Sequence, residues 1–277
     1  MNYKFTFEKI SPENEFAGVE FAGNIFIILN ALTYLSDDDR LFVDMETNDC
    51  VCTEKGPTIY STKNCWEYYF NQTTLTEDYK NMNFYTPSVL SYENKDAFIN
   101  TEIFIDLKKK FYDSFQIKPY IVEKINEYYQ NNLENKITLG VQVRLTDMVH
   151  NHRVSPLNSY IKKINQILSN NNDIKQIFLS TDDGSIIETL KENISIPIIY
   201  HDGMSRADSN SPNLNPYDRY KNGGEHHMYR MGLECLLEIL TLSKCNYLLK
   251  ADVSSLSLTS VILSENIKKV YRIWLTE

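Results

Sequence analysis

The chain has 277 residues, of which 42% are hydrophobic and 23% are charged, a composition typical of globular proteins. Its formal net charge is −9 and its lysines are scattered, which argues against a nucleic-acid backbone as the main partner. No run approaches the roughly 18 apolar residues of a membrane span, and the acid-containing N-terminal segment predicts a strand and not a signal peptide.

The cysteines are odd in number and show no zinc-type spacing. Cys50 and Cys52 are separated by a single residue, tighter than C-x-x-C, and no histidine lies near them. Cys235 and Cys245 lie in apolar segments, where a free thiol behaves as a small hydrophobe. We therefore expect no bound metal or other cofactor and a reducing, cytoplasmic compartment, with attachment to the inner face of the membrane left open. No oligomeric state is predicted.

The first half of the chain predicts a β-α-β opening. A strand near residues 3–9 precedes the apolar helical run FAGNIFIILNALTYL, which leads to strand-like residues 41–44. The aromatic segment 64–70 (NCWEYYF) predicts packing and not chemistry. Two helices are expected over residues 97–114 and 117–131, and the Lys/Asn-rich end of the second predicts a boundary near residue 136.

The second half alternates apolar strand-like runs with helical patterns, which predicts a parallel sheet with right-handed crossovers. Four of the strands end in polar segments, in the order RLTD, STDDG, HDG and DVSS. In open α/β sheets the ligand crevice lies outside the carboxyl ends of the strands. These segments therefore predict a site at that edge, although polar loops after strands are also common without any site. The expected strands cover residues 137–143, 176–180, 197–200, 247–249 and 270–274.

Arg144 is the sharpest candidate, because it follows an apolar strand in GVQVRLTD. An arginine presents a planar fork of donors that suits two phosphate oxygens and can neutralise charge on a departing diphosphate. Asp147 lies in the same loop, where a carboxylate can orient or deprotonate an acceptor hydroxyl. The alternative is a surface Arg–Asp pair worth less than about 1 kcal/mol.

The other strand ends offer weaker candidates. Ser254 and Ser255 follow a strand and open a helix, so they predict either an N-cap or an anion site. Asp182 and Asp183 predict an N-cap, a metal pair or acceptors for a nucleoside. Glu238 lies opposite a leucine stripe and faces either solvent, the commoner case, or the crevice.

Histidines near the arginine motif, among them His152, are candidate general bases, since a reference pKa of roughly 6.5 is close to neutral. Adjacent histidines at 226 and 227 make a poor metal pair. P-loop, classical dinucleotide and hydrolase-elbow motifs do not occur.

Three segments resemble a known family. GVQVRLTDMV resembles the H-V-R-R-T-D-K signature of fucosyltransferases that use GDP-fucose, and FLSTDDGSI resembles their "ATDD" segment. GLECLLEILTLSKCNYLLKADVSSLSLTSVIL is similar to their C-terminal segment, in which a helix, a strand and a Ser-rich turn follow one another. The order and spacing agree over about residues 138–265, and the resemblance is strongest to the α-1,6-fucosyltransferases, including the rhizobial nodulation enzyme, and to the protein O-fucosyltransferases.

The resemblance implies an α/β fold of the GT-B type, with two Rossmann-like domains: residues 1–136 on the acceptor side and residues 137–277 binding the nucleotide sugar on a parallel sheet. It also implies an inverting, metal-independent transfer of L-fucose or a related sugar from a GDP-sugar to a glycan acceptor. Because the sequence shows no signal peptide or membrane anchor, we expect a cytoplasmic enzyme of capsule or lipopolysaccharide biosynthesis. Carried over by position, the residues implied to act are Arg144 on the β-phosphate, Asp182 and Asp183 near the nucleoside, Glu238 on guanine, Ser254 and Ser255 on the diphosphate, and His152 as the base.

Departures from the signature leave alternatives open. Gln142, Leu145 and Met148 stand where the family has His, a second Arg and Lys. The chain is therefore alternatively a catalytically inactive member that binds a nucleotide or a glycan. A third hypothesis is a metal-dependent GT-A transferase built on the TDD segment, which would require Mn²⁺.

Overall fold

The computed structural model describes residues 1–7, 20–46, 50, 54, 59–73, 79–83, 101–146, 155–207, 226–251 and 254–273. The chain divides into two compact units. The N-terminal unit comprises Met1–Lys124 and Gly223–Leu236, and the C-terminal unit comprises Ile125–Asn222 and Leu237–Glu277. Within the described ranges, no helix is long and apolar enough to cross a membrane.

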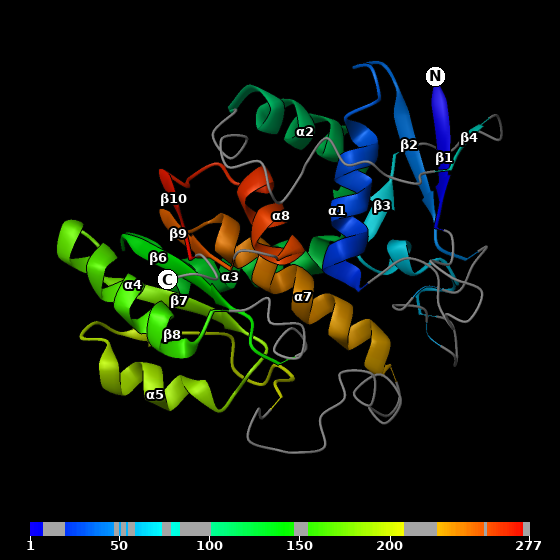
Figure 1. Cartoon of the computed structure of the whole chain (residues 1–277). Helices are drawn as coiled ribbons and strands as arrows, with labels where there is room; N and C mark the ends of the chain where they lie inside the picture. Colours follow the sequence, from blue (N-terminus) through cyan, green and yellow to red (C-terminus); the bar gives the residue numbers. More distant parts are fainter. Residues whose placement is uncertain are drawn as a thin grey trace. The chain divides into compact units, whose positions relative to one another are not determined.

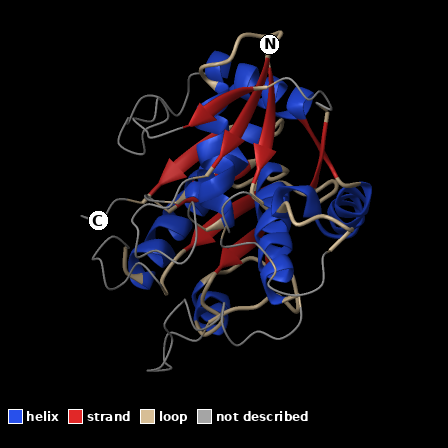
Figure 2. Cartoon of the chain, turned by 90° about the vertical axis from the view of Figure 1, so that its right-hand side faces the viewer, coloured by secondary structure: helices blue, strands red, loops and turns tan. Residues whose placement is uncertain are grey.

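The N-terminal unit contains a parallel sheet in the order β2-β1-β4. Its strands are β1 (Asn2–Thr6), β2 (Arg40–Asp44) and β4 (Lys80–Asn83), and α1 (Phe21–Leu32) connects β1 to β2. The predicted β-α-β opening is therefore confirmed (Figures 1 and 2). This unit also contains the 3-10 helix η1 (Cys65–Tyr68), α2 (Thr101–Ser114) and an antiparallel pair, β3 (Phe70–Gln72) with β5 (Phe115–Ile117).

The aromatic segment 64–70 packs as predicted. Trp66, Tyr68, Tyr69 and Phe70 are all buried. Trp66 stacks on Phe70 with ring centroids 4.3 Å apart and meets Phe115 edge-on at 5.0 Å. The segment therefore forms a core of the N-terminal unit.

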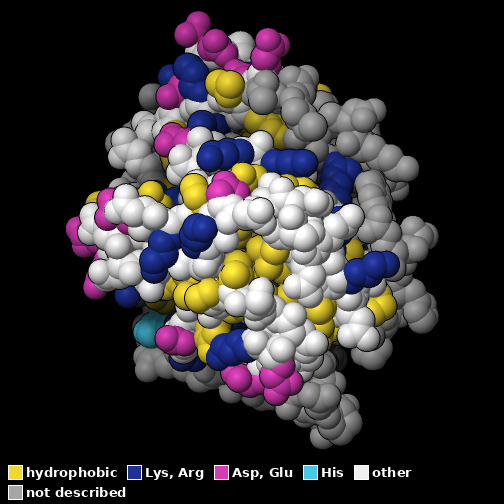
Figure 3. Space-filling model, turned by 90° about the vertical axis from the view of Figure 1, so that its left-hand side faces the viewer, with side chains coloured by type: hydrophobic (Ala, Val, Ile, Leu, Met, Phe, Trp, Pro, Cys, Tyr) yellow, Lys and Arg dark blue, Asp and Glu magenta, His cyan; other side chains and the backbone are white. Residues whose placement is uncertain are grey.

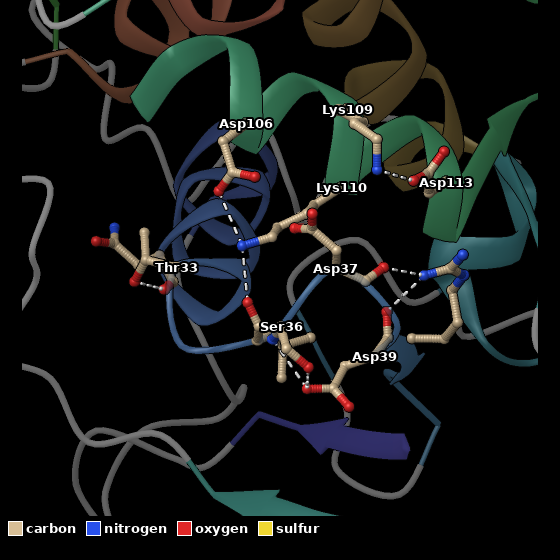
Figure 4. Close-up of polar contacts among 11 residues, drawn as sticks. Thr33, Ser36, Asp37, Asp39, Asp106, Lys109, Lys110 and Asp113 are labelled. Atoms are coloured by element: carbon tan, nitrogen blue, oxygen red, sulfur yellow. Dashed lines mark hydrogen bonds and ion pairs between the residues drawn. The ribbon is translucent and has the colours of Figure 1, made fainter. Parts of the chain in front are cut away.

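Polar contacts fix the connection between α1 and β2 (Figure 4). The Asp39 carboxylate accepts hydrogen bonds from the backbone N–H of Ser36 at 2.9 Å and from its hydroxyl at 2.6 Å. The Ser36 hydroxyl bond and the nearby N-terminal ammonium lower the pKa of Asp39 to about 2. From α2, Lys110 Nζ donates to the carbonyl of Leu35 at 2.7 Å, so this helix is tied to the end of α1.

The C-terminal unit contains a five-stranded sheet in the order β10-β9-β6-β7-β8, in which every pair is parallel. The predicted parallel sheet is therefore confirmed. The strands are β6 (Thr138–Val143), β7 (Gln176–Thr181), β8 (Ile198–Ile199), β9 (Tyr247–Lys250) and β10 (Lys269–Arg272). The helices that accompany them are α3 (Pro119–Asn132), α4 (Leu157–Asn170), α5 (Ile186–Asn193), α7 (His227–Ser243) and α8 (Ser255–Leu263), of which α3 and α7 begin in the N-terminal unit.

The two faces of this sheet are covered by different helices. On one face the alternate residues Leu139, Val141 and Val143 of β6 join a core that includes Tyr160 of α4 and Leu190 of α5. On the other face α7 approaches β6 closely at Gly140, where a Cβ atom would lie 2.9 Å from Leu242 Cδ2 and 3.2 Å from Cys245 Sγ. Glycine at this position therefore permits the helix to pack against the central strand.

Charged side chains are spread over the described part of the face in Figure 3, with acidic groups among the lysines and arginines. Cys50, Cys235 and Cys245 are free thiols, whereas Cys65 is disulfide-bonded.

Candidate functional site at the carboxyl edge of the C-terminal sheet

The strand order places a topological switch point at β6 and β9. From β6 the chain adds β7 and β8 on one side, and it then adds β9 and β10 on the other side of β6. In open α/β sheets, ligands bind outside the carboxyl ends of the strands at such a point. Arg144 directly follows β6, and Ser254 lies four residues after the end of β9. The topology thus brings two of the predicted site residues to neighbouring strand ends.

The loop that carries Arg144 is fixed by Asp182, the first residue after β7. The Asp182 carboxylate accepts from the backbone N–H groups of Leu145 and Thr146 at 3.0 and 3.2 Å, and from the Thr146 hydroxyl at 2.6 Å. The Arg144 side chain is half-buried. Asp182 therefore acts here as a positioning residue for the arginine loop, and its predicted contact with a nucleoside stays a prediction.

Asp183 is engaged by its own turn. Its side chain is fully buried, and Oδ1 accepts from the backbone N–H of Ser185 at 2.9 Å and from the Ser185 hydroxyl at 2.6 Å. These bonds fix the turn that leads from β7 into α5. Asp183 is therefore not the N-cap residue of α5, which is Ser185, and its predicted contact with a nucleoside stays a prediction.

Glu238 of α7 turns toward the sheet. A lone glutamate on a helix more commonly faces solvent, so this direction is the less common of the two that the sequence allowed. Its side chain is 13% exposed, and Oε2 accepts from the Ser180 hydroxyl of β7 at 2.8 Å. An ion pair at 3.9 Å joins Oε1 to Arg206. The carboxylate therefore lies over the carboxyl end of β7, where it is held from two sides.

Arg206 is a residue that the sequence analysis missed. It follows β8 in a polar segment without a motif, and backbone bonds from Ala207 N to Asp182 O (2.8 Å) and from Gly184 N to Ala207 O (2.7 Å) fix its place. Its side chain is 9% exposed and lies 5.2 Å from the Tyr200 ring centroid. No sequence signal identifies it, since the pairing of Ala207 with the end of β7 arises only in the folded sheet.

His201, the first residue of the HDG segment, is held against α3 and α7. Its ring centroid lies 4.0 Å from that of Tyr128, and Nε2 lies 2.8 Å from Thr241 Oγ1. Because the Thr241 hydroxyl proton is donated to Leu237 O, the Nε2–H tautomer donates to Thr241. Burial, and then the nearby Arg206 charge, lower the pKa of His201 to about 4. The imidazole is therefore neutral near pH 7 and has a structural role.

The N-terminus of α8 offers anion-binding groups. Ser254 is the N-cap residue, but its side chain makes no capping bond. It is 1% exposed, and its Oγ has no hydrogen-bond partner in the part of the chain that the structure describes. A buried hydroxyl without a partner is costly, and free N–H groups of a first helical turn attract anions. The capping function predicted as one alternative is therefore not performed by the Ser254 side chain, and Ser255 opens the helix.

Polar side chains also lie under this edge, on the face that α7 covers. Gln142 of β6 pairs in register with Ser180, and Lys250 of β9 pairs with Arg272. Lys250 is fully buried, and its ammonium donates to Ala251 O at 3.0 Å. Lys250 could have been identified from the sequence, because a lysine at the end of the apolar run YLLK in a parallel sheet is unusual.

Two predicted catalytic residues, Asp147 and His152, lie outside the described residues. Among the residues that are described, no group of three or more His, Cys, Asp or Glu side chains is placed to hold a metal ion.

Comparisons with known proteins were made for the sequence and for the structure. No protein-family model matches the chain, and no curated protein matches it. The structure is similar to NodZ α-1,6-fucosyltransferase soaked with GDP-fucose, with a TM-score of 0.55, 10% identity, and coverage of 95% of this chain and 93% of the other. The same enzyme co-crystallised with GDP gives a TM-score of 0.54 with the same identity and coverages.

Fucosyltransferase NodZ from Bradyrhizobium gives a TM-score of 0.53 at 10% identity, covering 95% of this chain and 94% of the other. At this identity the likeness concerns the fold. The chain therefore has a GT-B-like α/β fold similar to that of fucosyltransferase NodZ, as the resemblance of its motifs predicted.

Proposed function

We propose that the protein is an inverting, metal-independent glycosyltransferase that moves L-fucose, or a related sugar, from a GDP-sugar to a glycan acceptor. The observation that carries this proposal is the placement of Arg144 at the switch point of the C-terminal sheet, on the strand next to the one that leads to α8. NodZ, whose fold the chain shares, was crystallised with GDP and with GDP-fucose.

The diphosphate of the donor would meet three groups at this edge. The Arg144 guanidinium can bind two phosphate oxygens at once. The Ser254 hydroxyl and the N-terminus of α8 can donate to others. Asp182 keeps the arginine loop in one geometry, so positive charge is already in place when the leaving group develops negative charge.

Transfer then follows ordinary substitution chemistry. The acceptor hydroxyl oxygen bonds to C1 of the sugar on the face opposite the diphosphate, and the bond from C1 to the β-phosphate oxygen breaks. Its electron pair leaves with GDP, and the acceptor proton passes to a general base. We propose Asp147 or His152 for that base. The acceptor class that we propose is a glycan of a capsule or lipopolysaccharide, handled by residues 1–136.

Glu238 is our candidate for reading the base. A carboxylate can accept from the N1–H and N2–H groups of guanine, and Ser180 and Arg206 hold this one at a fixed place. We propose that Arg206 keeps Glu238 oriented, which favours guanine over bases that lack those two donors.

The first experiment is a thermal-shift comparison of GDP-, UDP- and CMP-sugars, followed by an assay of Arg144→Ala. GDP-sugars alone should raise the melting temperature, because a ligand that binds only the folded state stabilises it by mass action. Arg144→Ala should lower the transfer rate about 10²–10³-fold, with the melting temperature of the unliganded protein nearly unchanged. Arg144→Lys keeps the charge but not the planar fork of donors, so its transfer rate should lie between those of the wild type and Arg144→Ala.

The second candidate, an inactive member that binds the nucleotide, is favoured by Gln142, Leu145 and Met148 at signature positions. Slow release of GDP from GDP-fucose by the wild-type protein, lost in Arg144→Ala, would contradict it. Stabilisation by GDP without any release would contradict the transferase.

A further inference from the structure

Tyr60 of the N-terminal unit occupies a strained turn. Ile59 and Thr62 form an antiparallel bridge, and Thr62 N donates to Ile59 O at 3.2 Å. The two residues between them, Tyr60 and Ser61, have φ angles of 52° and 61°. This geometry normally selects Asn-Gly, because each other L-residue in the left-handed region costs about 1–2 kcal/mol.

The surroundings hold the turn in this conformation. The Thr62 hydroxyl donates to Glu67 Oε2 at 2.7 Å and accepts from the backbone N–H of Asn64 at 3.1 Å. Asn64 in turn is buried and donates to Val43 O at 2.8 Å. A bulky aromatic is therefore kept where asparagine would fit with less strain, which points to a use for its side chain.

That side chain is exposed beside other tyrosines. Tyr60 is 57% exposed. Its ring centroid lies 6.0 Å from that of Tyr120, at an interplanar angle of 33°, and 6.3 Å from that of Tyr229, which it meets edge-on. The Tyr229 hydroxyl donates to the Tyr120 hydroxyl at 3.0 Å, which donates to Tyr68 O at 3.0 Å. We call Tyr60, Tyr120 and Tyr229 the tyrosine platform.

Polar groups surround the platform. Lys118 Nζ lies 5.9 Å from the centroid of the Tyr60 ring and donates to Asn71 Oδ1 at 2.6 Å. Glu54 Oε1 accepts from the backbone N–H of Tyr229 at 2.7 Å. An ammonium, an amide and a carboxylate thus lie around exposed aromatic surface.

We propose that the tyrosine platform binds a pyranose ring of the glycan acceptor, an inference that rests on the proposed function. A pyranose has a face of C–H groups, which packs on an aromatic ring, and a rim of hydroxyls, which needs both donors and acceptors. The platform presents both kinds of group together. An apolar protein partner would leave the lysine and glutamate unmatched, and an anionic membrane would be repelled by a chain of net charge −9.

The strain in the turn separates a binding role from a structural one. Tyr60→Asn places a residue that tolerates positive φ in the turn, so the melting temperature should stay the same or rise. Ser61→Gly relieves strain at the next position and keeps the ring, so it serves as the matched control. Tyr60→Trp keeps an aromatic face.

The probes are the methyl β-glycosides of glucose, galactose and N-acetylglucosamine, observed by saturation-transfer NMR. Wild type, Ser61→Gly and Tyr60→Trp should give signals from at least one glycoside, and Tyr60→Asn should lose them. With a transferred acceptor, Tyr60→Asn should raise KM about tenfold, with kcat and stabilisation by GDP unchanged.

Several outcomes would overturn the inference. These are the absence of signals from the wild type, equal signals or equal KM in Tyr60→Asn, and a Tyr60→Asn variant whose melting temperature falls together with its binding. Binding to phosphatidylglycerol vesicles that Tyr60→Asn abolishes would replace the glycan with a membrane surface. A wild-type protein that GDP does not stabilise would reject the proposed function instead, because the NMR signals do not depend on GDP.

Discussion

His201 shows how single residues in the C-terminal unit are set by their surroundings. The segment HDG was predicted to supply polar groups to the carboxyl edge of the sheet, yet the imidazole packs between Tyr128 and Thr241 and is neutral near pH 7. The arginine that follows it, Arg206, reaches Glu238 instead. Which polar residue of a loop faces the edge depends on contacts that the loop sequence does not encode.

The lowered pKa of His201 makes stability depend on pH. In the unfolded chain its pKa is about 6.5, and in the folded protein it is about 4. Between these values the unfolded state binds the proton and the folded state does not, so the free energy of unfolding falls as the pH is lowered from about 6.5 to about 4, by up to about 3 kcal/mol. NMR titration of the imidazole should give the low pKa directly.

His201→Gln keeps a donor for Thr241 and removes the titration. Urea denaturation of the wild type and His201→Gln across this pH range should show that the wild type loses stability relative to the variant as the pH falls. Other titrating groups contribute equally to both proteins, so their contributions cancel in the difference of unfolding free energy. Parallel curves would show that His201 is not the group responsible.

At the scale of elements, two neighbouring lysines of α2 make unlike contacts (Figure 4). Lys110 is 11% exposed, donates to Leu35 O at 2.7 Å and pairs with Asp106 at 2.8 Å. Lys109 is 56% exposed and pairs only one turn along its own helix, with Asp113 at 3.0 Å. The bond from Lys110 to Leu35 joins α2 to the connection that follows α1, whereas the pair of Lys109 and Asp113 joins two surface side chains of one helix.

Lys110→Met should therefore lower the free energy of unfolding by about 2 kcal/mol, because the Leu35 carbonyl loses a charged donor in a partly buried site. Lys109→Met is the matched control and should change stability little, since exposed ion pairs are screened by solvent. Chemical denaturation of the two variants measures both. Equal effects would mean that the link from α2 to α1 does not contribute.

At the scale of the whole molecule, the strand order of the C-terminal sheet decides where a ligand can bind. The order β10-β9-β6-β7-β8 puts the strand ends that carry Arg144 and lead to Ser254 next to each other. In the proposed mechanism, positive charge at that point comes from the Arg144 guanidinium and the N-terminus of α8, so the transfer should need no cation to stabilise the leaving diphosphate.

We therefore expect EDTA to leave the transfer rate unchanged, and added Mn²⁺ or Mg²⁺ to have no effect beyond that of ionic strength. Assays with the GDP-sugar that gives the largest thermal shift provide the measurement. Activity that EDTA abolishes and Mn²⁺ restores would favour the metal-dependent GT-A hypothesis.

The sequence by itself determined the elements of the C-terminal unit, since apolar strand runs and helical periodicity depend on neighbours in the chain. It also made Arg144 a candidate site residue, because an arginine directly after an apolar strand is visible without any fold. Only the tertiary structure decided that Asp182 holds the arginine loop and that Glu238 faces the sheet. Each of these contacts joins residues from different elements or selects one of two possible side-chain directions, and such choices are made by packing and hydrogen bonding across the sheet.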